Sequence, residues 1–249
     1  MPREINVLVL LFPGFDFLDV GGPVEVLGKG GTDNIQFKFT IASHTEETKS
    51  AEGVAIKRNK SLEEVARSIA DFHILVQPGA GLDKIKAYRA ETAIFEKHIG
   101  IIDRFTSLSP TRGEHRALLS ICTGALIVGS SGAFSGLEVT THYEGLELLH
   151  EYCELYRKKY GGKPVKIIPD LNDGSKGPES SRIQAAYRSG QRTQVRWVDA
   201  GENEHGVRVI SSGGISCGLD ASLFLLSEVV SVEKARFSAR IMEYAWRWA

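Results

Sequence analysis

One cysteine in this sequence stands where a reactive thiol is expected. The apolar segment 117–121 runs directly into Cys122, which is followed by Thr123, Gly124 and a stretch with helical character. This is the strand–nucleophile–helix layout of a nucleophile elbow, in which a sharp turn presents the side chain at the edge of a sheet. Amides at the start of the helix are expected to lower the pKa of the Cys122 thiol from about 8.5 to roughly 3.5–7.5. The alternative is a buried structural cysteine, the commoner role of a lone cysteine.

A thiol nucleophile needs a proton donor or acceptor, and Asp19 is the first candidate. It lies between Leu18 and Val20, shortly after the first apolar segment. If its carboxyl group is partly buried, its pKa rises and it can pass a proton to and from a substrate. The competing interpretation is that Asp19 only caps a helix. Asp16 is predicted to be a turn residue on the surface.

Further candidate residues each follow an apolar, strand-like segment. His142 comes after one such segment and is predicted to line the pocket. Gly79 and Ala80 follow another, so their backbone N–H groups are predicted to stabilise a developing negative charge. Gly214 follows the last predicted strand and is expected to bind substrate or stabilise charge at the same place.

Other kinds of site find no support in the sequence. The seven histidines show no ligand spacing with cysteines or carboxylates, so no metal site is predicted. The segment 79–81 matches neither GxGxxG nor a P-loop, so nucleotide binding is not predicted. Of the other cysteines, Cys153 is predicted to be inert within a helix. Cys217 is placed near the pocket without being the nucleophile.

Segments of strand length alternate along the chain with segments of helical pattern. The alternation predicts an α/β fold with a mostly parallel sheet and helices on both faces. Ligands bind such folds outside the carboxyl ends of the strands, where Asp19, Gly79, Cys122 and Gly214 are expected. The predicted strands are 5–11, 36–42, 72–76, 117–121, 138–141 and 207–211, with a hairpin arm at 54–57. The predicted helices are 19–27, 88–105, 125–129, 143–155, 219–230 and 233–248.

The 249 residues have an ordinary globular composition but an uneven distribution of charge. The net charge is −1, yet residues 157–196 hold ten lysines and arginines against three acids, which is +7 against −8 elsewhere. Large apolar residues are scarce there, so we predict a single domain, 1–249, with a basic insertion at about 157–196. We expect this insertion to pack on or near the acidic body, at the pocket rim or a dimer interface. Nucleic-acid binding is disfavoured, because the acidic body would repel a phosphate backbone.

Cysteine number and hydropathy bear on the compartment. Three cysteines, an odd number, argue against a disulfide framework and favour a reducing environment. The longest purely apolar run, 7–12, is far shorter than the ~20 residues of a membrane-spanning helix. The N-terminus has no signal-peptide pattern. These observations predict a cytoplasmic protein with no membrane partner.

Four strings together resemble the ThiJ/PfpI superfamily and, within it, the isonitrile (isocyanide) hydratase branch. The resemblance covers about residues 5–156 and 197–235, and it implies a flavodoxin-like three-layer sandwich, a homodimer, a small-molecule substrate and no cofactor. It also implies Cys122 as the nucleophile, Asp19 as its catalytic partner and Thr123 as a side-chain contributor to the site. The strings are Phe12-Pro13…Leu18-Asp19…Gly22-Pro23…Val26-Leu27, Ile121-Cys122-Thr123-Gly124, Thr140-Thr141-His142, and Ser212-Gly213-Gly214-Ile215…Gly218-Leu219-Asp220.

The resemblance implies a lyase that adds water to an organic isonitrile, giving an N-substituted formamide through a cysteine thioimidate. Two alternatives stay open. One is a glyoxalase or deglycase acting on reactive carbonyls, although those branches carry His after the cysteine and Glu near the first strand, where this chain has Thr123 and Asp19. The other is a redox-sensing or chaperone-like protein that uses Cys122 as an oxidisable thiol. The basic insertion lies outside the resemblance and leaves the natural substrate open.

Overall fold

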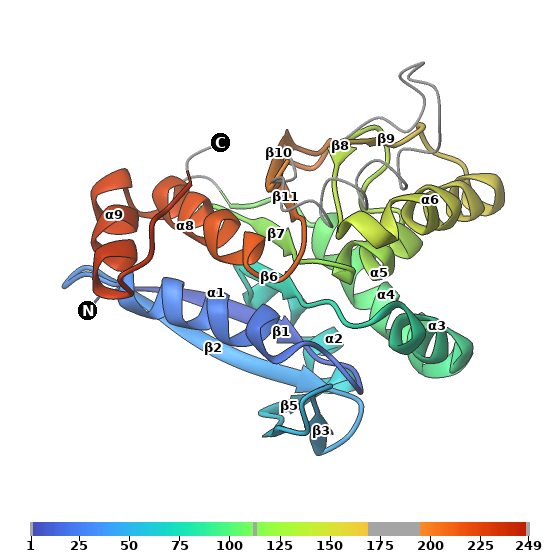
Figure 1. The fold of residues 1–249 in the computed structure, drawn as a ribbon, viewed down its shortest axis with the longest axis horizontal. Helices are drawn as coiled ribbons and strands as arrows, with labels where there is room; N and C mark the ends of the chain where they lie inside the picture. Colours follow the sequence, from blue (N-terminus) through green and yellow to red (C-terminus); the bar gives the residue numbers. More distant parts are fainter. Residues whose placement is uncertain (1, 112–113, 169–194, 248–249) are drawn as a thin grey trace, which may run out of the picture.

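The computed structural model describes residues 2–111, 114–168 and 195–247, which are built around one seven-stranded sheet (Figure 1). Six strands are parallel, and the seventh, at one edge, is antiparallel to its neighbour. In spatial order they are β10 (Trp197–Glu202), β11 (Arg208–Ser212), β7 (Ala117–Ser120), β6 (Ile74–Gln77), β1 (Arg3–Leu10), β2 (Ile35–Ser43) and β5 (Lys60–Ser61). Two small sheets pair β3 (Glu47–Lys49) with β4 (Ala55–Lys57) and β8 (Glu138–Val139) with β9 (Lys166–Ile167).

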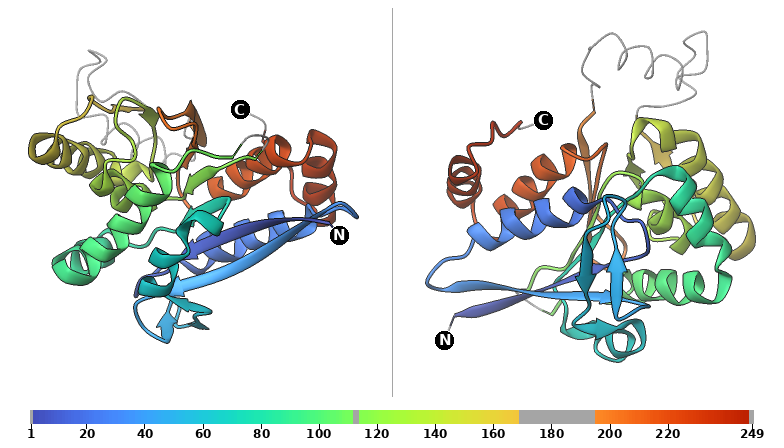
Figure 2. Two further views of the ribbon diagram at one scale, coloured as in Figure 1. Left: turned by 180° about the vertical axis from the view of Figure 1, so that it is seen from behind. Right: turned by 60° about the horizontal axis from the view of Figure 1, so that its bottom comes forward.

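Two groups of helices cover the sheet and give three layers (Figures 1 and 2). One group consists of α1 (Phe17–Lys29), α8 (Cys217–Val229) and α9 (Val232–Ile241), which pack against one another. The other consists of α2 (Leu62–Arg67), α3 (Leu82–Ala90), α4 (Thr92–Thr106), α5 (Gly124–Ser131) and α6 (Leu146–Tyr160). The predicted α/β fold, with a mostly parallel sheet and helices on both faces, is confirmed. No helix within the described ranges is long and apolar enough to cross a membrane.

Apolar residues fill the centre of the sheet on both of its faces. Leu8, Leu75, Leu118 and Val209 form one row across four adjacent strands, and all four are fully buried. Strands buried on both faces read as continuous apolar runs, which is why this sheet was recognisable in the sequence. Because the four strands are parallel and in register, their carboxyl ends lie side by side at one edge. Chain segments that are far apart in sequence are therefore brought together there.

Several boundaries differ from those predicted, each for a local reason. The predicted helix 88–105 is two helices, because the backbone at Glu91 leaves the helical region with φ −77° and ψ 62°. The predicted strand 138–141 ends at Val139 and pairs with β9 in a small separate sheet. The chain then turns through a short 3₁₀ helix, Tyr143–Gly145, before α6 begins.

The carboxyl-terminal part of the chain also departs from the prediction. The closing helix, predicted over 233–248, ends at Ile241. The edge strand β10 was not predicted, because its residues are half-buried and its pairing with β11 shifts register between Asp199 and Glu202. An edge strand with a bulge lacks the alternating apolar pattern that identifies strands in a sequence.

The described part of the basic window does not form a separate unit. Its first residues, 157–160, belong to the last turn of α6, which therefore runs past the predicted start of the insertion at about 157. Three of its basic side chains form ion pairs with acids elsewhere in the chain: Arg157 with Glu154, Lys166 with Glu138, and Arg196 with Asp220. Residues 169–194, on which most of the predicted insertion falls, lie outside the described residues.

A buried hydrogen-bond chain braces the end of β6. His98 is fully buried, and burial lowers its pKa to about 3, so its ring is neutral. Its Nε2 lies 2.6 Å from Gln77 Oε1, and its Nδ1 lies 2.9 Å from the Tyr88 hydroxyl. Gln77 Nε2 donates in turn to Pro78 O at 3.0 Å. This chain fixes the backbone just before Gly79.

Tyr88→Phe is expected to lower the free energy of unfolding by about 1–3 kcal/mol, because His98 Nδ1 then loses its hydrogen-bond donor in a buried position. Urea denaturation of the two proteins measures the difference. The matched control is Tyr160→Phe, since Tyr160 is 58% exposed and its replacement should change the stability by less than about 0.5 kcal/mol. Equal losses in the two variants would contradict the assigned role of the network.

Candidate active site

Cys122 occupies a sharp turn between β7 and α5. Its φ of 54° lies in the left-handed region, where residues other than glycine are uncommon. The backbone holds this conformation by two hydrogen bonds, from Cys122 N to Gly213 O at 3.1 Å and from Thr141 Oγ1 to Cys122 O at 2.8 Å. A strained residue held by its surroundings at the carboxyl edge of a parallel sheet is typical of a nucleophile elbow. The predicted layout around Cys122 is present.

The ionisation of the thiol differs from the prediction. Cys122 is only 5% exposed, and burial raises the pKa of its thiol above the ordinary value, with a further rise from the nearby Asp19 carboxylate. The backbone N–H groups of Thr123 and Ile215 lower the pKa of the thiol, but they do not offset burial. The expected net lowering by the start of α5 is therefore wrong. The resting side chain is a neutral thiol.

Asp19 is a buried acid rather than a helix cap. It lies in the first turn of α1 and is fully buried, whereas Asp16 caps the helix by accepting from Leu18 N at 3.0 Å. Asp19 Oδ2 accepts from Gly79 N at 2.9 Å, and Oδ1 has no hydrogen-bond partner among the described residues. Burial raises the pKa of Asp19 well above its ordinary value, as predicted.

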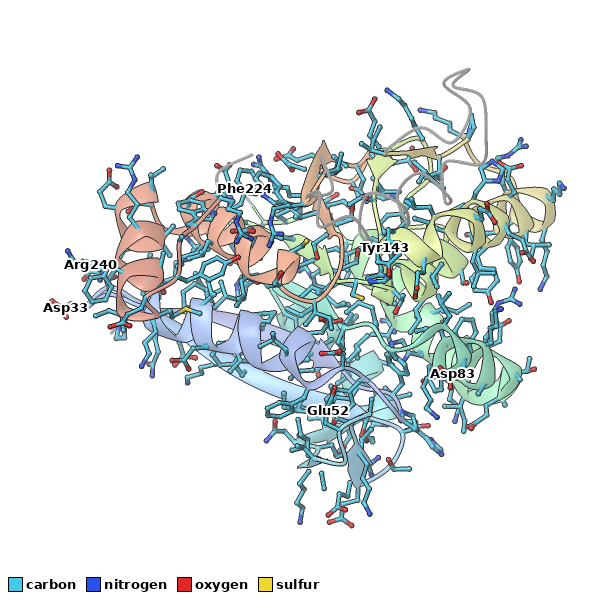
Figure 3. The ribbon with its side chains drawn as sticks, viewed as in Figure 1. Asp33, Glu52, Asp83, Tyr143, Phe224 and Arg240 are labelled. Carbon is cyan, nitrogen blue, oxygen red and sulfur yellow. The ribbon has the colours of Figure 1, made fainter. Side chains whose placement is uncertain are left out.

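The acids around Asp19 add to this effect. The charges of Asp16 and Glu52 both raise the pKa of Asp19, and Glu52 is labelled near the start of α1 in Figure 3. Glu52 also accepts from Phe17 N at 3.2 Å, which keeps it at the amino end of the helix. Asp19 is therefore held as a neutral carboxylic acid over a wider pH range than an ordinary aspartate. Its unpartnered Oδ1 leaves it able to exchange a proton with a group in the site.

The backbone N–H groups of Gly79 and Ala80 hold the side chains of Asp19 and Thr123 in place, and neither N–H is free in this structure. Gly79 N donates to Asp19, and Ala80 N donates to Thr123 Oγ1 at 2.8 Å, so both amides are already engaged, and their role in stabilising a developing charge stays a prediction. Thr123 Oγ1 also donates to Ala80 O at 2.5 Å. A Cβ at Gly79 would lie 2.7 Å from Thr123 N, so only glycine fits where the loop meets the elbow.

Thr123→Val is expected to lower kcat by about tenfold and the free energy of unfolding by about 1–3 kcal/mol. Valine keeps the shape of threonine but removes both hydrogen bonds to Ala80, leaving a buried backbone pair unpartnered. Thr123→Ser keeps the hydroxyl and should retain most of both quantities. Turnover assays and urea denaturation measure the two effects. A Thr123→Val protein with the kcat and the free energy of unfolding of the wild type would contradict the role assigned to the two hydrogen bonds between Thr123 and Ala80.

His142 and Gly214 lie against each other across the site. A Cβ at Gly214 would be 2.6 Å from His142 Cδ2, so the absence of a side chain makes room for the ring. His142 Nδ1 accepts from Glu144 N at 3.3 Å, and burial lowers the pKa of the imidazole, which keeps it neutral near pH 7. Tyr143, labelled in Figure 3 near the first turn of α6, packs against the same ring, with the ring centroids 4.3 Å apart and the ring planes tilted by 41°. His142 and Gly214 are thus brought together, and their lining of a substrate pocket stays a prediction.

Two groups at the site were not singled out from the sequence. The first is the backbone N–H of Ile215, which lowers the pKa of the Cys122 thiol. The second is the Thr141 hydroxyl, which holds the carbonyl of the strained elbow. The glycine pair before Ile215 was the available signal for the first. The strand-like pattern of 138–141 concealed the second.

Cys153 and Cys217 lie buried with free thiols, and burial raises the pKa of each. Neither has the elbow geometry of Cys122. Within the part of the chain that the structure describes, no group of three or more His, Cys, Asp and Glu side chains is arranged to hold a metal ion.

Known proteins are similar to this chain in sequence and in fold. The chain is 25% identical to an isonitrile hydratase of Pseudomonas putida over 243 residues, which is 97% of this chain and 79% of that protein. Its fold is similar to that of a ThiJ/PfpI family protein from Pseudomonas syringae, with a TM-score of 0.66, 19% identity and coverage of 98% and 76% of the two chains. It is also similar to Drosophila melanogaster DJ-1beta, with a TM-score of 0.65, 18% identity and coverage of 98% and 100%. The family model for DJ-1/PfpI matches residues 5–165, more than half of the chain. The chain therefore belongs to the DJ-1/PfpI family.

Proposed function

We propose that this protein is an isonitrile hydratase, which adds water to an organic isonitrile and releases an N-substituted formamide. The observation that carries the proposal is that a fully buried acid, Asp19, lies near the thiol on the strained elbow, Cys122: the charge of Asp19 raises the pKa of that thiol, and burial raises the pKa of Asp19 itself. An isonitrile carbon needs both a nucleophile and a proton, and these two groups supply them. The similarity over nearly the whole chain to an isonitrile hydratase of Pseudomonas putida supports the same substrate class.

In the first step the Cys122 sulfur attacks the terminal carbon of R–N≡C. The S–H proton is given up as the S–C bond forms, and the acid form of Asp19 delivers a proton to the same carbon through Oδ1. Asp19 recovers a proton from the thiol, so the net change is addition of S–H across the carbon to give the thioimidate R–N=CH–S–Cys122. The amides of Thr123 and Ile215 stabilise the negative charge that passes through the sulfur.

In the second step water adds to the thioimidate carbon. One proton of the water reaches the nitrogen with help from Asp19, giving R–NH–CH(OH)–S–Cys122. The C–S bond then breaks, the remaining hydroxyl becomes the formyl oxygen, and its proton returns to the sulfur. The products are R–NH–CHO and the free thiol, so the site is restored with no external oxidant or reductant.

The state of the thiol argues against the redox alternative. Peroxides react with thiolates, and burial keeps Cys122 in its neutral form. A reactive-carbonyl activity is supported by no particular feature of the described site, since Thr123 and Asp19 replace the residues that the glyoxalase and deglycase branches carry.

The test is incubation of the purified protein with several alkyl and aryl isonitriles, with mass detection of the formamide. Multiple turnovers per protein molecule with at least one isonitrile are expected. Methylglyoxal is tested in parallel, and lactate formation there with no formamide from any isonitrile would replace the proposal with the reactive-carbonyl activity. Oxidation of Cys122 by mild peroxide without turnover of either substrate would favour the redox alternative.

A further inference from the structure

The turn between β11 and α8 forms one wall of the site around the thiol. Gly213 O accepts from the Cys122 N–H at 3.1 Å, so the turn is joined directly to the elbow, and the Ile215 N–H lowers the pKa of the Cys122 thiol. Cys217 N donates to Gly214 O at 2.7 Å and closes the turn as α8 begins. The position of the Ile215 amide relative to the sulfur therefore depends on how firmly this turn is held.

Arg196 ties the turn to the body of the protein through several hydrogen bonds. Its carbonyl accepts from Gly213 N at 2.8 Å, and its Nη2 donates to Ser216 Oγ at 3.3 Å. Its Nε donates to Asp220 Oδ2 at 2.5 Å, one turn into α8. Tyr244 OH lies 3.4 Å from Arg196 Nη2 and donates to Ser216 O at 3.3 Å. One guanidinium thus joins the turn, the first part of α8 and the segment after α9.

The partner of Arg196 is a carboxylate that is fully buried. Asp220 has no exposed surface, and its Oδ1 accepts from Arg247 N at 2.9 Å, so both carboxylate oxygens are engaged. A buried ion pair adds little stability compared with apolar residues of the same volume, because desolvation opposes the attraction. What a planar, two-pronged guanidinium adds is a fixed geometry between the groups that it joins.

We infer that Arg196 is a positioning residue of this site: with Asp220 it holds the turn 213–216 so that the Ile215 amide points at the Cys122 sulfur and stabilises negative charge there. The inference rests on the proposed function for its turnover readout, but its reactivity readout is independent of any substrate. It gives one residue of the basic window a role in the chemistry of the site.

The experiment measures the rate at which iodoacetamide alkylates Cys122, located by peptide mass, in the wild type, Arg196→Met, Arg196→Lys and Tyr244→Phe.

Arg208→Met is the matched control. Arg208 lies on β11 and pairs with Asp199 at 2.6 Å and 3.0 Å, and its side chain is 29% exposed against 21% for Arg196. Its pairs are with Asp199 and Glu228, away from the turn 213–216.

Alkylation at a fixed pH is expected to slow on the order of tenfold in Arg196→Met, the factor for losing one hydrogen bond to a charged group. Arg196→Lys keeps the positive charge opposite Asp220 but loses the planar guanidinium that joins several groups at once. This variant should fold like the wild type, and its Cys122 should still be alkylated more slowly. Tyr244→Phe should show a smaller decrease, and Arg208→Met should stay within about twofold. With an isonitrile substrate, the loss should appear in kcat while KM changes little, because the Ile215 amide acts on the sulfur.

If no variant of any kind turns over isonitriles but the order of alkylation rates holds, the proposed function fails and the role of Arg196 stands. If Arg196→Met and Arg196→Lys alkylate at the rate of Arg208→Met, the inference is overturned, whether or not the wild type hydrates isonitriles. Loss of fold in Arg196→Met alone leaves the decision to Arg196→Lys and Tyr244→Phe, which must both react more slowly than the control.

Discussion

Cys122→Ala is expected to lower kcat/KM for a small alkyl isonitrile by about 10⁴-fold or more, the scale seen when a covalent nucleophile is removed. The loss follows because no S–C bond can form without the sulfur, and Asp19 then has no thiol from which to recover the proton that it gives to the isonitrile carbon. Initial rates of formamide production, measured by mass spectrometry, give the ratio.

The matched control is Cys153→Ala. Cys153 is also buried, 6% exposed against 5% for Cys122, and its thiol is likewise free, but it lies in α6 away from the elbow. This variant should keep its activity within about threefold, with a small loss of stability from the cavity that the missing sulfur leaves. Equal losses of activity in the two variants would mean that the assay reports damage to the fold and would contradict the role of Cys122.

Asp19→Asn is expected to lower kcat by about 10²–10⁴-fold, the usual contribution of a positioned acid–base group. The asparagine oxygen can still accept from Gly79 N, so the loop stays in place while the transferable proton is lost. Asp16→Asn is the control, because asparagine is as good a helix cap as aspartate and Asp16 does not contact the reacting atoms in the proposed mechanism. Its kcat should stay within about threefold. Wild-type kcat in Asp19→Asn would exclude the carboxyl group as the proton carrier.

The same substitution has a signature in stability. The pKa of Asp19 is raised in the folded protein, so the stability that its neutral form provides is present below the unfolded pKa and is lost as the pH rises through the folded pKa. Between those two pKa values the wild type loses about 1.4 kcal/mol per pH unit from this group. The stability of Asp19→Asn relative to the wild type should therefore increase with pH, as measured by urea denaturation between pH 4 and 8. A difference that does not vary with pH would contradict the raised pKa.

The wild-type activity should carry the matching pH dependence. The acid form of Asp19 is the proposed proton donor, so kcat is expected to fall as the pH rises through its raised pKa. The fall should be absent from the residual activity of Asp19→Asn. If kcat falls with the same midpoint pH in the wild type and in Asp19→Asn, the titrating group is not Asp19.

The positions of Cys122 and Asp19 could be predicted from the sequence because both follow continuous apolar runs. Strands buried on both faces, such as β1 and β7, leave a clear pattern, and the first polar residues after them must lie at the carboxyl edge. Cys122 and Asp19 are found there, on the strained elbow and in the first turn of α1. The sequence left open whether Asp19 is a buried acid or a helix cap, and the structure shows it fully buried, with Asp16 as the cap.

The properties of these groups depend on contacts that local sequence does not encode. The pKa of Cys122 is set by burial under the turn 213–216, which comes from a segment some ninety residues later, so the start of α5 alone predicted the wrong direction. The amides of Gly79 and Ala80 are occupied by Asp19 and Thr123, partners on two other elements. Neither pairing leaves a trace in spacing or composition.

The basic window could be recognised from the sequence, but its boundaries could not. Its start lies in α6, where lysines and arginines continue an amphipathic helix and the dipole favours basic residues in the last turn. Its end, Arg196, is the anchor of the turn beside the thiol. A charge count treats these residues as one group, whereas the fold gives them separate roles.

The most direct test of the account is the mass of the protein during turnover. A reaction with excess alkyl isonitrile is stopped with denaturant within the first turnovers, and the intact protein and its peptides are weighed. We expect a species heavier by the mass of one isonitrile molecule, located at Cys122, that disappears once the isonitrile is consumed and the formamide has formed. Formamide production with no adduct at Cys122, or an adduct that never decays, would contradict hydration through a thioimidate on this residue.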